Sequence, residues 1–438
     1  MDILQNNKSG PNLQSRLKGN DWKEMLLLVY VFSLPYISAF AFTSTVSLPL
    51  IFAVGLFFTM ALEMICTVKL PPGFVGFDLV YVLLFLFLVV FSFVINGYGI
   101  GKSLNHTIAY LSTFLLFYVA VKFALFNLNN TSLAFKRILQ AITYATCISA
   151  IFANVEFISV NVFKLDLNQF IPRAVEGEDF YNPTVVGLFI RARGFATESG
   201  HFTLMMELFS PLTIYYLYFS GYCKWGALLK VILVIIILFS FFFAASSASF
   251  IIIPVAVALA AVVRVKRIFL YVQRDLKKFI TTTLVASGIF IVFNYFLSLY
   301  ALILLSLADK LDSTSFDDRQ ERIDFFYDKF FHFDPVMQLC GAGPAGFINL
   351  GYDESKSSLS LYYKLAFETG YLGLLLFTLL IFYVLLNTLQ IRSKVGFFLL
   401  ISVISGVVHY YFISNYWYPW FWFIAAFAIF CSKKNIKA

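Results

Sequence analysis

Residues 77–95 read FDLVYVLLFLFLVVFSFVI, a run of 19 residues in which Asp78 is the only charged side chain. A helix rises about 1.5 Å per residue, so roughly 20 apolar residues cross a hydrocarbon core about 30 Å thick. Lipid offers no hydrogen-bond partner to an unpaired backbone amide, so a run of this kind crosses a bilayer as a helix. This stretch therefore predicts a transmembrane helix.

The remainder of the chain repeats this pattern. Of its 438 residues, 60% are hydrophobic and 13% are charged, and the mean hydropathy is +0.83. An average soluble domain is about one quarter charged, so this composition excludes a soluble globule. Asn415 and the aromatic cluster from Tyr416 to Trp420 separate the last two apolar runs, and eleven spans is the alternative count. We expect an all-α polytopic membrane protein with twelve transmembrane helices, centred in residues 25–42, 45–65, 77–95, 106–126, 137–158, 200–220, 226–244, 247–263, 279–304, 359–388, 396–414 and 417–431.

Lys and Arg residues in short loops stay on the cytoplasmic side of a membrane and so predict the orientation of the chain. Short outer loops carry only Lys102 when the N-terminus is placed inside. The net charge of +8 then reflects topology, and no basic stripe of the kind that binds nucleic acid is present. The basic residues of the inner side are Lys8, Arg16, Lys18, Lys23, Lys69, Lys136, Arg137, Lys224, Arg264, Lys266, Arg267, Arg274, Lys277, Lys278, Arg392, Lys394, Lys433, Lys434 and Lys437.

This orientation divides the chain into membrane and loop regions. We expect the first helix to be retained, although residues 39–41 (Ala-Phe-Ala) resemble a signal cleavage site. The predicted regions are a cytoplasmic segment (1–24), helices 1–5 (25–158), a large outer loop (159–199), helices 6–9 (200–304), a second large outer loop (305–358), helices 10–12 (359–431) and a cytoplasmic tail (432–438).

The five cysteines are scattered, and no CxxC or Cys/His spacing is present. Metal and redox sites need clustered ligands at short spacing. We therefore expect no metal and no cofactor.

The two large outer loops hold most of the remaining outward-facing basic residues, and loops of this length in a compact protein are usually functional. In the first, Arg191-Ala-Arg193-Gly194 reads as extended, so both guanidinium groups would point one way. Glu198 and His201 follow at the start of the sixth span and suit a proton acceptor and the group that orients it. The alternative is a helix cap in which Glu198 forms a salt bridge to Arg193.

In the second large loop, Ser315 followed by two aspartates predicts the start of an amphipathic helix. Its apolar stripe runs through Phe326 and Phe330 at helical spacing. We expect this helix to lie on the outer membrane surface and to hold Arg319 and Arg322 at headgroup depth. In the alternative, both arginines snorkel and pair with Asp318 and Asp324.

Residues 341–346 (GAGPAG) match GxGxxG but follow no predicted strand, so a dinucleotide site is excluded. The two remaining interpretations are a tight backbone turn and a backbone surface that approaches a phosphate or sugar. A helix beginning near Ser358 then crosses Glu368-Thr-Gly370, where Lys364 and Glu368 are spaced to pair. The predicted substrate-binding residues are His201, Gly341, Gly343, Lys356, Tyr363 and Lys364.

Other polar residues in or near the spans are interpreted as structural. Their predicted roles are helix-end or interhelical contacts, although charges at membrane depth are often functional. They are His106, His332, His409, Glu63, Lys122, Glu207 and Lys230.

The predicted catalytic residues Arg191, Arg193, Glu198, Arg319 and Arg322 suit a substrate with a pyrophosphate at the membrane surface. Guanidinium binds phosphate oxygens in a planar fork, and partial dehydration strengthens the contact. A lipid pyrophosphate-linked sugar presents this group at that depth. The arginines would stabilise the pyrophosphate as it departs.

The ordered motifs resemble the superfamily of O-antigen polymerases (Wzy-type) and O-antigen ligases. They are residues 191–198, then Arg322-Ile-Asp-Phe-Phe leading to Gly341-Ala-Gly343, then Phe367-Glu-Thr-Gly370-Tyr-Leu-Gly373. The resemblance spans roughly residues 185–390, with Arg191 or Arg193, and Arg322, in the arginine positions of the family. It implies metal-independent transfer of a glycan from undecaprenyl pyrophosphate onto another lipid-linked repeat unit, on the periplasmic face of the bacterial inner membrane. It also implies a partner that regulates chain length.

The chain departs from the family pattern at two places. Ligases carry a His-Asn pair where this chain has Leu359-Ser360, which favours a polymerase. A frequent Ser-Arg-Gly turn is residues 246–248 (Ser-Ser-Ala) here, so a further phosphate contact is not expected there. The alternatives are an O-antigen ligase or protein O-oligosaccharyltransferase, and a flippase or other transporter.

Overall fold

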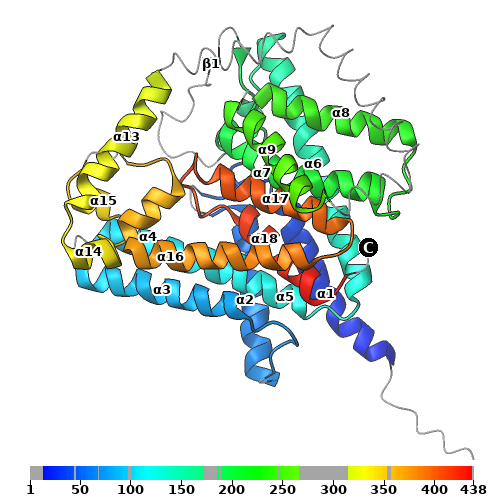
Figure 1. Cartoon of the computed structure of the whole chain (residues 1–438). Helices are drawn as coiled ribbons and strands as arrows, with labels where there is room; N and C mark the ends of the chain where they lie inside the picture. The colour runs from blue at the N-terminus through cyan, green and yellow to red at the C-terminus, as the bar shows by residue number, and fades with distance from the viewer. Residues whose placement is uncertain are drawn as a thin grey trace, which may run out of the picture.

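The computed structural model describes residues 13–43, 46–67, 69–96, 100–171, 173, 185–186, 189–244, 246–265, 314–352 and 357–436. These residues form a helical bundle with one two-stranded antiparallel ladder, β1 (Val185–Val186) with β2 (Phe189–Ile190) (Figure 1). The helical elements in chain order are α1 (Leu13–Ser33), α2 (Leu48–Thr67), α3 (Phe77–Asn96), α4 (Ile100–Ser112), the π-helical η1 (Thr113–Ala120), α5 (Val121–Phe126), α6 (Thr131–Asn161), η2 (Leu167–Phe170), α7 (Ser199–Ile214), the π-helical η4 (Tyr215–Phe219), α8 (Ala227–Ala244), α9 (Ser247–Val263), α13 (Thr314–Phe331), α14 (Pro335–Cys340), α15 (Gly346–Asn349), α16 (Leu361–Gln390), α17 (Val395–His409) and α18 (Pro419–Lys433).

The chain is a membrane-embedded all-α protein. Within the described residues, six helical stretches are long and apolar enough to cross a bilayer: α2, α3, the continuous rod Gly101–Phe126, α6, α8 and α16. Shorter apolar helices are Ala248–Val263, α17 and α18. Eleven of the twelve predicted runs contain a helix, and the run 279–304 lies outside the described residues.

The predicted first span, 25–42, is wrong in its second half because α1 ends at Ser33. Pro35 explains this end, since proline has no N–H to donate and disfavours helical geometry in the residue before it. The carbonyl oxygen of Leu34 accepts instead from the indole Nε1 of Trp420 at 2.6 Å. The chain then turns away and forms a bridge between Ala39 and Arg173.

Helix α18 lies at the centre of the bundle (Figure 1). Every residue from Pro419 to Cys431 is buried, so the helix is surrounded by protein on all sides. Helix α3, in contrast, exposes Leu83, Phe87 and Val94, a surface suited to lipid.

The contacts define two ends of the bundle. At the end that we call the loop end, α3 finishes, α16 begins and α17 finishes: Asn96 Nδ2 donates to the Gly341 carbonyl at 3.1 Å, and the Leu361 amide donates to the Tyr410 carbonyl at 2.9 Å. At the opposite end, Arg264 Nη2 donates to the Thr388 carbonyl at 3.0 Å.

Candidate functional site

The loop between α17 and α18, residues 410–418, links the other parts of the loop end, and we call it the aromatic loop. It reads YYFISNYWY. Pro419 follows as the first residue of α18, the helix position at which proline is best tolerated. Tyr416 and Tyr418 are buried, whereas Tyr411 and Trp417 are exposed. Both arginine-bearing segments predicted from the sequence contact this loop.

The first of these segments, residues 189–198, is held by a buried carboxylate and a buried guanidinium. Glu156 Oε2, on α6, accepts from the backbone amides of Arg193 at 3.0 Å and Gly194 at 2.8 Å. Arg173 donates to the carbonyls of Gly194 at 2.5 Å and Ala196 at 2.6 Å, and its Nη2 lies 3.8 Å from Glu156 Oε1. Backbone groups that have no partner in a ladder are thus satisfied by charged side chains.

Arg191 and Arg193 approach different carboxylates, so the predicted single cationic surface is not formed. The Nε atom of Arg193 lies 3.8 Å from Glu156 Oε1, deep in the protein. Arg191 faces Glu198: burial lowers the pKa of the Arg191 guanidinium, and Glu198 partly offsets this. Burial among protein atoms raises the pKa of the Glu198 carboxyl, and Arg191 opposes that rise. The predicted alternative pairing of Glu198 with Arg193 is wrong, because Arg191 takes that place.

His201 does not orient Glu198. Its Nδ1 is hydrogen-bonded to the Thr197 hydroxyl at 2.7 Å and to the Tyr418 hydroxyl at 2.9 Å. The ring is buried and meets the Tyr418 ring edge-on at a centroid distance of 4.7 Å. These contacts join the start of α7 to the aromatic loop. His201 therefore does not form the predicted pair in which it would orient Glu198 as a proton acceptor.

The second arginine-bearing segment is α13, which begins one residue before the predicted Ser315. Its apolar stripe packs on protein: Phe326 and Phe330 are buried in a cluster with Ala342, Ala366 and Phe367. The prediction that this stripe rests on the membrane surface is therefore wrong. Packing of Phe326 and Phe330 against α16 holds α13 at the loop end. Tyr327, on the same stripe, remains exposed.

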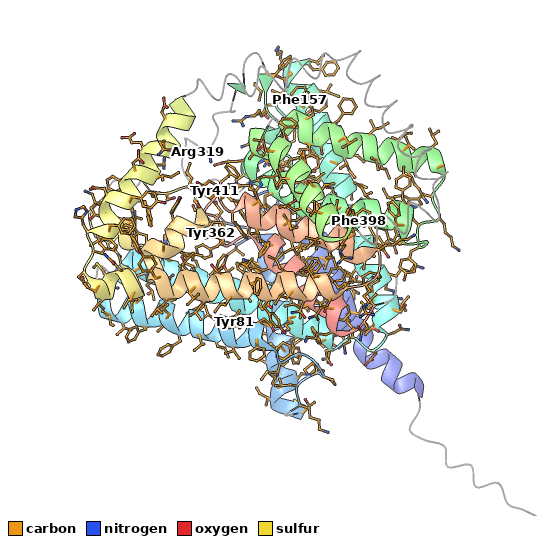
Figure 2. The ribbon with its side chains drawn as sticks, in the orientation of Figure 1. Tyr81, Phe157, Arg319, Tyr362, Phe398 and Tyr411 are labelled. Atoms are coloured by element: carbon orange, nitrogen blue, oxygen red, sulfur yellow. The ribbon has the colours of Figure 1, made fainter. Side chains whose placement is uncertain are left out.

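Arg319 points from α13 toward the aromatic loop (Figure 2). Its Nη1 donates to the Phe412 carbonyl at 3.4 Å, and its guanidinium carbon lies 5.9 Å from the centre of the Phe412 ring. Burial lowers the pKa of this guanidinium, and the neighbouring Asp318 partly offsets the shift. Arg322 donates to Asp318 at 2.9 Å and to the Ser357 carbonyl at 3.0 Å, so the predicted pairing with Asp318 holds for Arg322.

Two of the predicted substrate-binding residues at the start of α16 also border the loop, and Lys356 lies outside the described residues. The Nζ of Lys364 lies 5.0 Å from the centre of the Trp417 ring and 5.6 Å from that of Tyr416. The hydroxyl of Tyr363 lies 3.3 Å from that of Tyr327 on α13. A cation and several hydroxyls therefore line one side of the aromatic loop.

The GxG turn is a packed backbone turn. The amides of Ala342 and Gly343 donate to the Phe367 and Glu368 carbonyls at 2.8 and 3.0 Å, and Gly341 donates to Met337 at 2.7 Å. Gly341 and Gly343 have φ of 81° and 84°, and a Cβ on Gly341 would meet the backbone of Glu368. The amides of Ala342 and Gly343 face α16 and that of Gly341 faces α14, so the tight-turn interpretation fits better than a phosphate-binding surface.

His409, Lys122 and Lys230 form contacts of the helix-end or interhelical kind predicted for them. His409 Nδ1 and Glu207 Oε2 are 2.8 Å apart, both fully buried between α17 and α7. Lys122 pairs with the buried carboxylate of Asp78. Lys230 donates to the Cys223 carbonyl at 3.2 Å.

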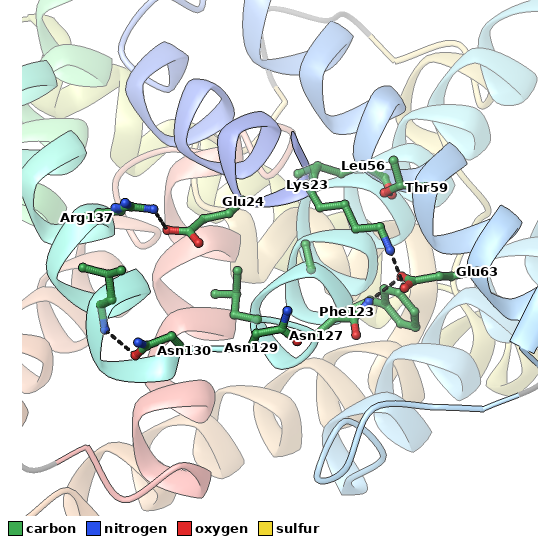
Figure 3. Close-up of a pocket in the computed structure, with 13 residues that line it drawn as sticks. Lys23, Glu24, Leu56, Thr59, Glu63, Phe123, Asn127, Asn129, Asn130 and Arg137 are labelled. Atoms are coloured by element: carbon green, nitrogen blue, oxygen red, sulfur yellow. Dashed lines mark hydrogen bonds and ion pairs between the residues drawn. The ribbon is translucent and has the colours of Figure 1, made fainter. Parts of the chain in front are cut away.

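A polar cavity of about 170 Å³ lies at the opposite end, between α1, α2 and the turn that precedes α6 (Figure 3). Glu63 binds both Lys23 and Asn127 there, and Glu24 binds Arg137 at 2.8 Å. The four charges thus form two pairs within the cavity wall and leave no net charge for a ligand to neutralise.

Sequence reasoning missed Glu156, Arg173 and the aromatic loop. The signal for this loop was the concentration of tyrosine and tryptophan beside Asn415, which is typical of an amphipathic binding surface. No protein-family model matches this chain, and no curated protein sequence matches it.

Proposed function

We propose that this protein is a polymerase of lipid-linked oligosaccharide repeat units, of the O-antigen polymerase kind. It would transfer the growing glycan from undecaprenyl pyrophosphate onto a sugar hydroxyl of a second lipid-linked unit. The observation that carries the proposal is the meeting of both arginine-bearing segments at the aromatic loop. Tyr418 contacts the segment that bears Arg191, and Phe412 contacts Arg319.

The side chains of this region match the parts of such a substrate. Arg191 and Arg319 are partly desolvated guanidinium groups, which bind phosphate oxygens more strongly than exposed ones. Tyr411 and Trp417 are exposed aromatic rings, which suit the apolar faces of sugars. Phe412 and Tyr418 are six residues apart, so their Cα atoms lie at most about 20 Å from each other. This span accommodates a diphosphate and the first sugars.

The topology predicted from charge places the loop end in the periplasm of a bacterial inner membrane, with both termini in the cytoplasm. Lys23, Arg137, Arg264 and Lys394 then lie on the cytoplasmic side, as the positive-inside rule expects. The pyrophosphate of a lipid carrier would reach the loop end at headgroup depth. Donor and acceptor are both lipid-linked, and we expect a separate chain-length regulator as partner.

A deletion strain tests the proposal. Surface polysaccharide reduced to one repeat unit, and restored to long chains by the wild-type chain, supports a polymerase. Polymer that accumulates on the lipid carrier, with bare surface lipid, would instead indicate a ligase. Repeat units trapped in the cytoplasm would indicate a flippase.

Point variants in that strain test the site. Arg191→Ala and Arg319→Ala should each lower turnover by about 10²-fold to 10³-fold, the usual loss for one charge-stabilising donor. Lysine at either position should rescue poorly, because an ammonium lacks the planar fork. The matched control is Arg137→Ala, which removes a half-exposed guanidinium at the opposite end and should leave chain length unchanged. Full activity of both arginine variants would remove them from the site.

A further inference from the structure

We propose that His106 and Glu368 form a proton-accepting pair, in which His106 takes the proton of the attacking sugar hydroxyl and Glu368 positions the imidazole. This inference rests on the proposed function and assigns its general base. His106 comes from α4 and Glu368 from α16, residues 262 positions apart in the chain. His106 Nδ1 lies 3.4 Å from Glu368 Oε1.

The carboxylate of Glu368 is buried and fixed from several sides. Its Oε2 accepts from the Tyr110 hydroxyl at 2.5 Å, and its Oε1 accepts from the Ala345 amide at 3.2 Å. The glutamate side chain is 4% exposed, so its position is determined by protein groups and not by water. A carboxylate held in this way keeps the neighbouring imidazole in one orientation.

The turn that contributes the Ala345 amide is strained. Ala345 has φ 57° and ψ 19°, in the left-handed region that is unfavourable for a residue with a side chain. Hydrogen bonds from Ala342 and Gly343 to the backbone of α16 hold the turn in this shape. Such strain persists where the surrounding structure enforces it, often at functional sites. Here it aims an N–H group at Glu368.

The imidazole of His106 is accessible, whereas the rings of His201 and His409 are buried. The His106 side chain is 31% exposed, whereas that of His409 is 1% exposed and its Glu207 partner 0%. His106 Nδ1 is buried beside Glu368 and makes no hydrogen bond in this structure, so a proton held on it would face the carboxylate. The opposite ring nitrogen, Nε2, would then be the free base. The separation of 3.4 Å is longer than a strong hydrogen bond, as is common for catalytic pairs before substrate binds.

The pair borders the aromatic loop. Tyr110 stacks on Tyr416 with ring centroids 4.0 Å apart and an interplanar angle of 4°. The Tyr416 hydroxyl donates to the His106 carbonyl at 3.5 Å. The charged group facing Glu368 from its own helix is Lys364, which also lies over the Tyr416 ring. The proposed base therefore lies beside the side chains proposed to bind the donor.

The step balances as follows. The acceptor hydroxyl oxygen forms a bond to the anomeric carbon of the donor sugar, and the bond from that carbon to the pyrophosphate oxygen breaks. The electron pair of the broken bond leaves with undecaprenyl pyrophosphate. The hydroxyl proton passes to His106 Nε2, and water or the departing pyrophosphate later removes it.

The test uses the purified full chain in lipid nanodiscs with the lipid-linked repeat unit extracted from the deletion strain. His106→Ala should lower turnover by about 10²-fold to 10⁴-fold, the contribution of one general base. Its affinity for undecaprenyl pyrophosphate, measured separately, should stay within about twofold of wild type, because the base does not hold the donor. Free imidazole should restore part of the turnover. Glu368→Gln should lower turnover with little change in KM.

The control is His332→Ala, which removes an exposed histidine on the same end and should leave turnover unchanged. Loss of both turnover and undecaprenyl pyrophosphate binding in His106→Ala, without rescue by imidazole, would show a structural role and overturn the inference. Wild-type turnover in His106→Ala would overturn it too. If the wild-type protein itself makes no polymer from the repeat unit, the proposed function fails instead.

Discussion

Glu156→Ala should release the segment that bears Arg191 from the bundle. The substitution removes the acceptor of two backbone amides, those of Arg193 and Gly194, and the counter-charge of Arg173, whose side chain is 2% exposed. Hydrogen bonds to a charged group contribute about 1.5 to 3 kcal/mol each. Removal of one partner of a buried ion pair costs about 3 to 5 kcal/mol. The two figures describe overlapping contacts, so about 3 to 5 kcal/mol is expected in total.

This loss should appear locally, because the segment can detach without unfolding the helices. Each 1.4 kcal/mol changes an equilibrium tenfold, so the amides of Arg193 and Gly194 should exchange hydrogen at least about 10²-fold faster than in wild type. Hydrogen exchange followed by mass spectrometry of the peptide 189–198 measures this. Glu156→Gln keeps one acceptor oxygen and should give an intermediate rate.

The matched control is Glu24→Ala, which breaks a partly exposed ion pair with Arg137 at the opposite end. Exposed pairs contribute about 0 to 1 kcal/mol, so exchange in the peptide 189–198 should not change. Wild-type exchange in that peptide for Glu156→Ala would refute the reasoning, because it would mean that Arg173 or the β2 contacts suffice to hold the segment.

Three further predictions concern the loop end. Gly370→Ala should destabilise the purified protein by about 2 kcal/mol or more and lower its thermal midpoint, because only glycine readily adopts φ 66° and ψ −171° and a Cβ would meet the end of α14. The control Gly101→Ala, where a Cβ on α4 would meet open space, should be neutral or stabilising. Equal thermal midpoints for the two variants would contradict this prediction. Arg191→Gln should raise the already raised pKa of the Glu198 carboxyl further. When the pKa of a carboxyl is higher in the folded than in the unfolded protein, the fold loses stability as the pH rises from the unfolded-state pKa to the folded-state pKa. In the variant, the thermal midpoint should therefore keep falling to a higher pH than in wild type. A fall that ends at the same or a lower pH would exclude the Arg191 contact. Trp417→Ala should raise KM for the lipid-linked unit several-fold with little change in kcat, because the exposed ring is proposed to bind a sugar without taking part in the reaction. A loss confined to kcat would exclude this sugar-binding role.

The helices could be predicted from sequence because lipid leaves few choices. A long apolar run must be helical in a bilayer, and α3 and α9 follow their predicted runs closely. The error at α1 has a local cause, since Pro35 ends the helix while the hydropathy continues. The apolar stripe on α13 is visible in the sequence, but its predicted position on the membrane surface is wrong, because periodicity cannot say whether lipid or protein covers a stripe. Phe367, from a distant helix, supplies that cover.

The contacts that build the loop end could not be predicted, because they join residues far apart in the chain. Glu368 meets Tyr110 across 258 residues, and His201 meets Tyr418 across 217. A single sequence reports which polar side chains lie near a membrane but not which of them face each other. The GxG turn and the glutamate of α16 likewise meet through backbone hydrogen bonds that the order of the motifs does not predict.

The polar contacts of the loop end share one physical logic. Glu156 and Glu368 are both buried, and both accept hydrogen bonds from a turn that contains a residue at positive φ. Glu156 accepts from two backbone amides, including that of Gly194, and Glu368 accepts from that of Ala345. Loops beside lipid cannot rely on water to satisfy their amides, so a fixed carboxylate takes that role. The same two carboxylates stand next to Arg193 and His106. The groups that make the turns rigid therefore also set the charges that the proposed substrate would meet, and a change at either glutamate should alter loop position and site chemistry together.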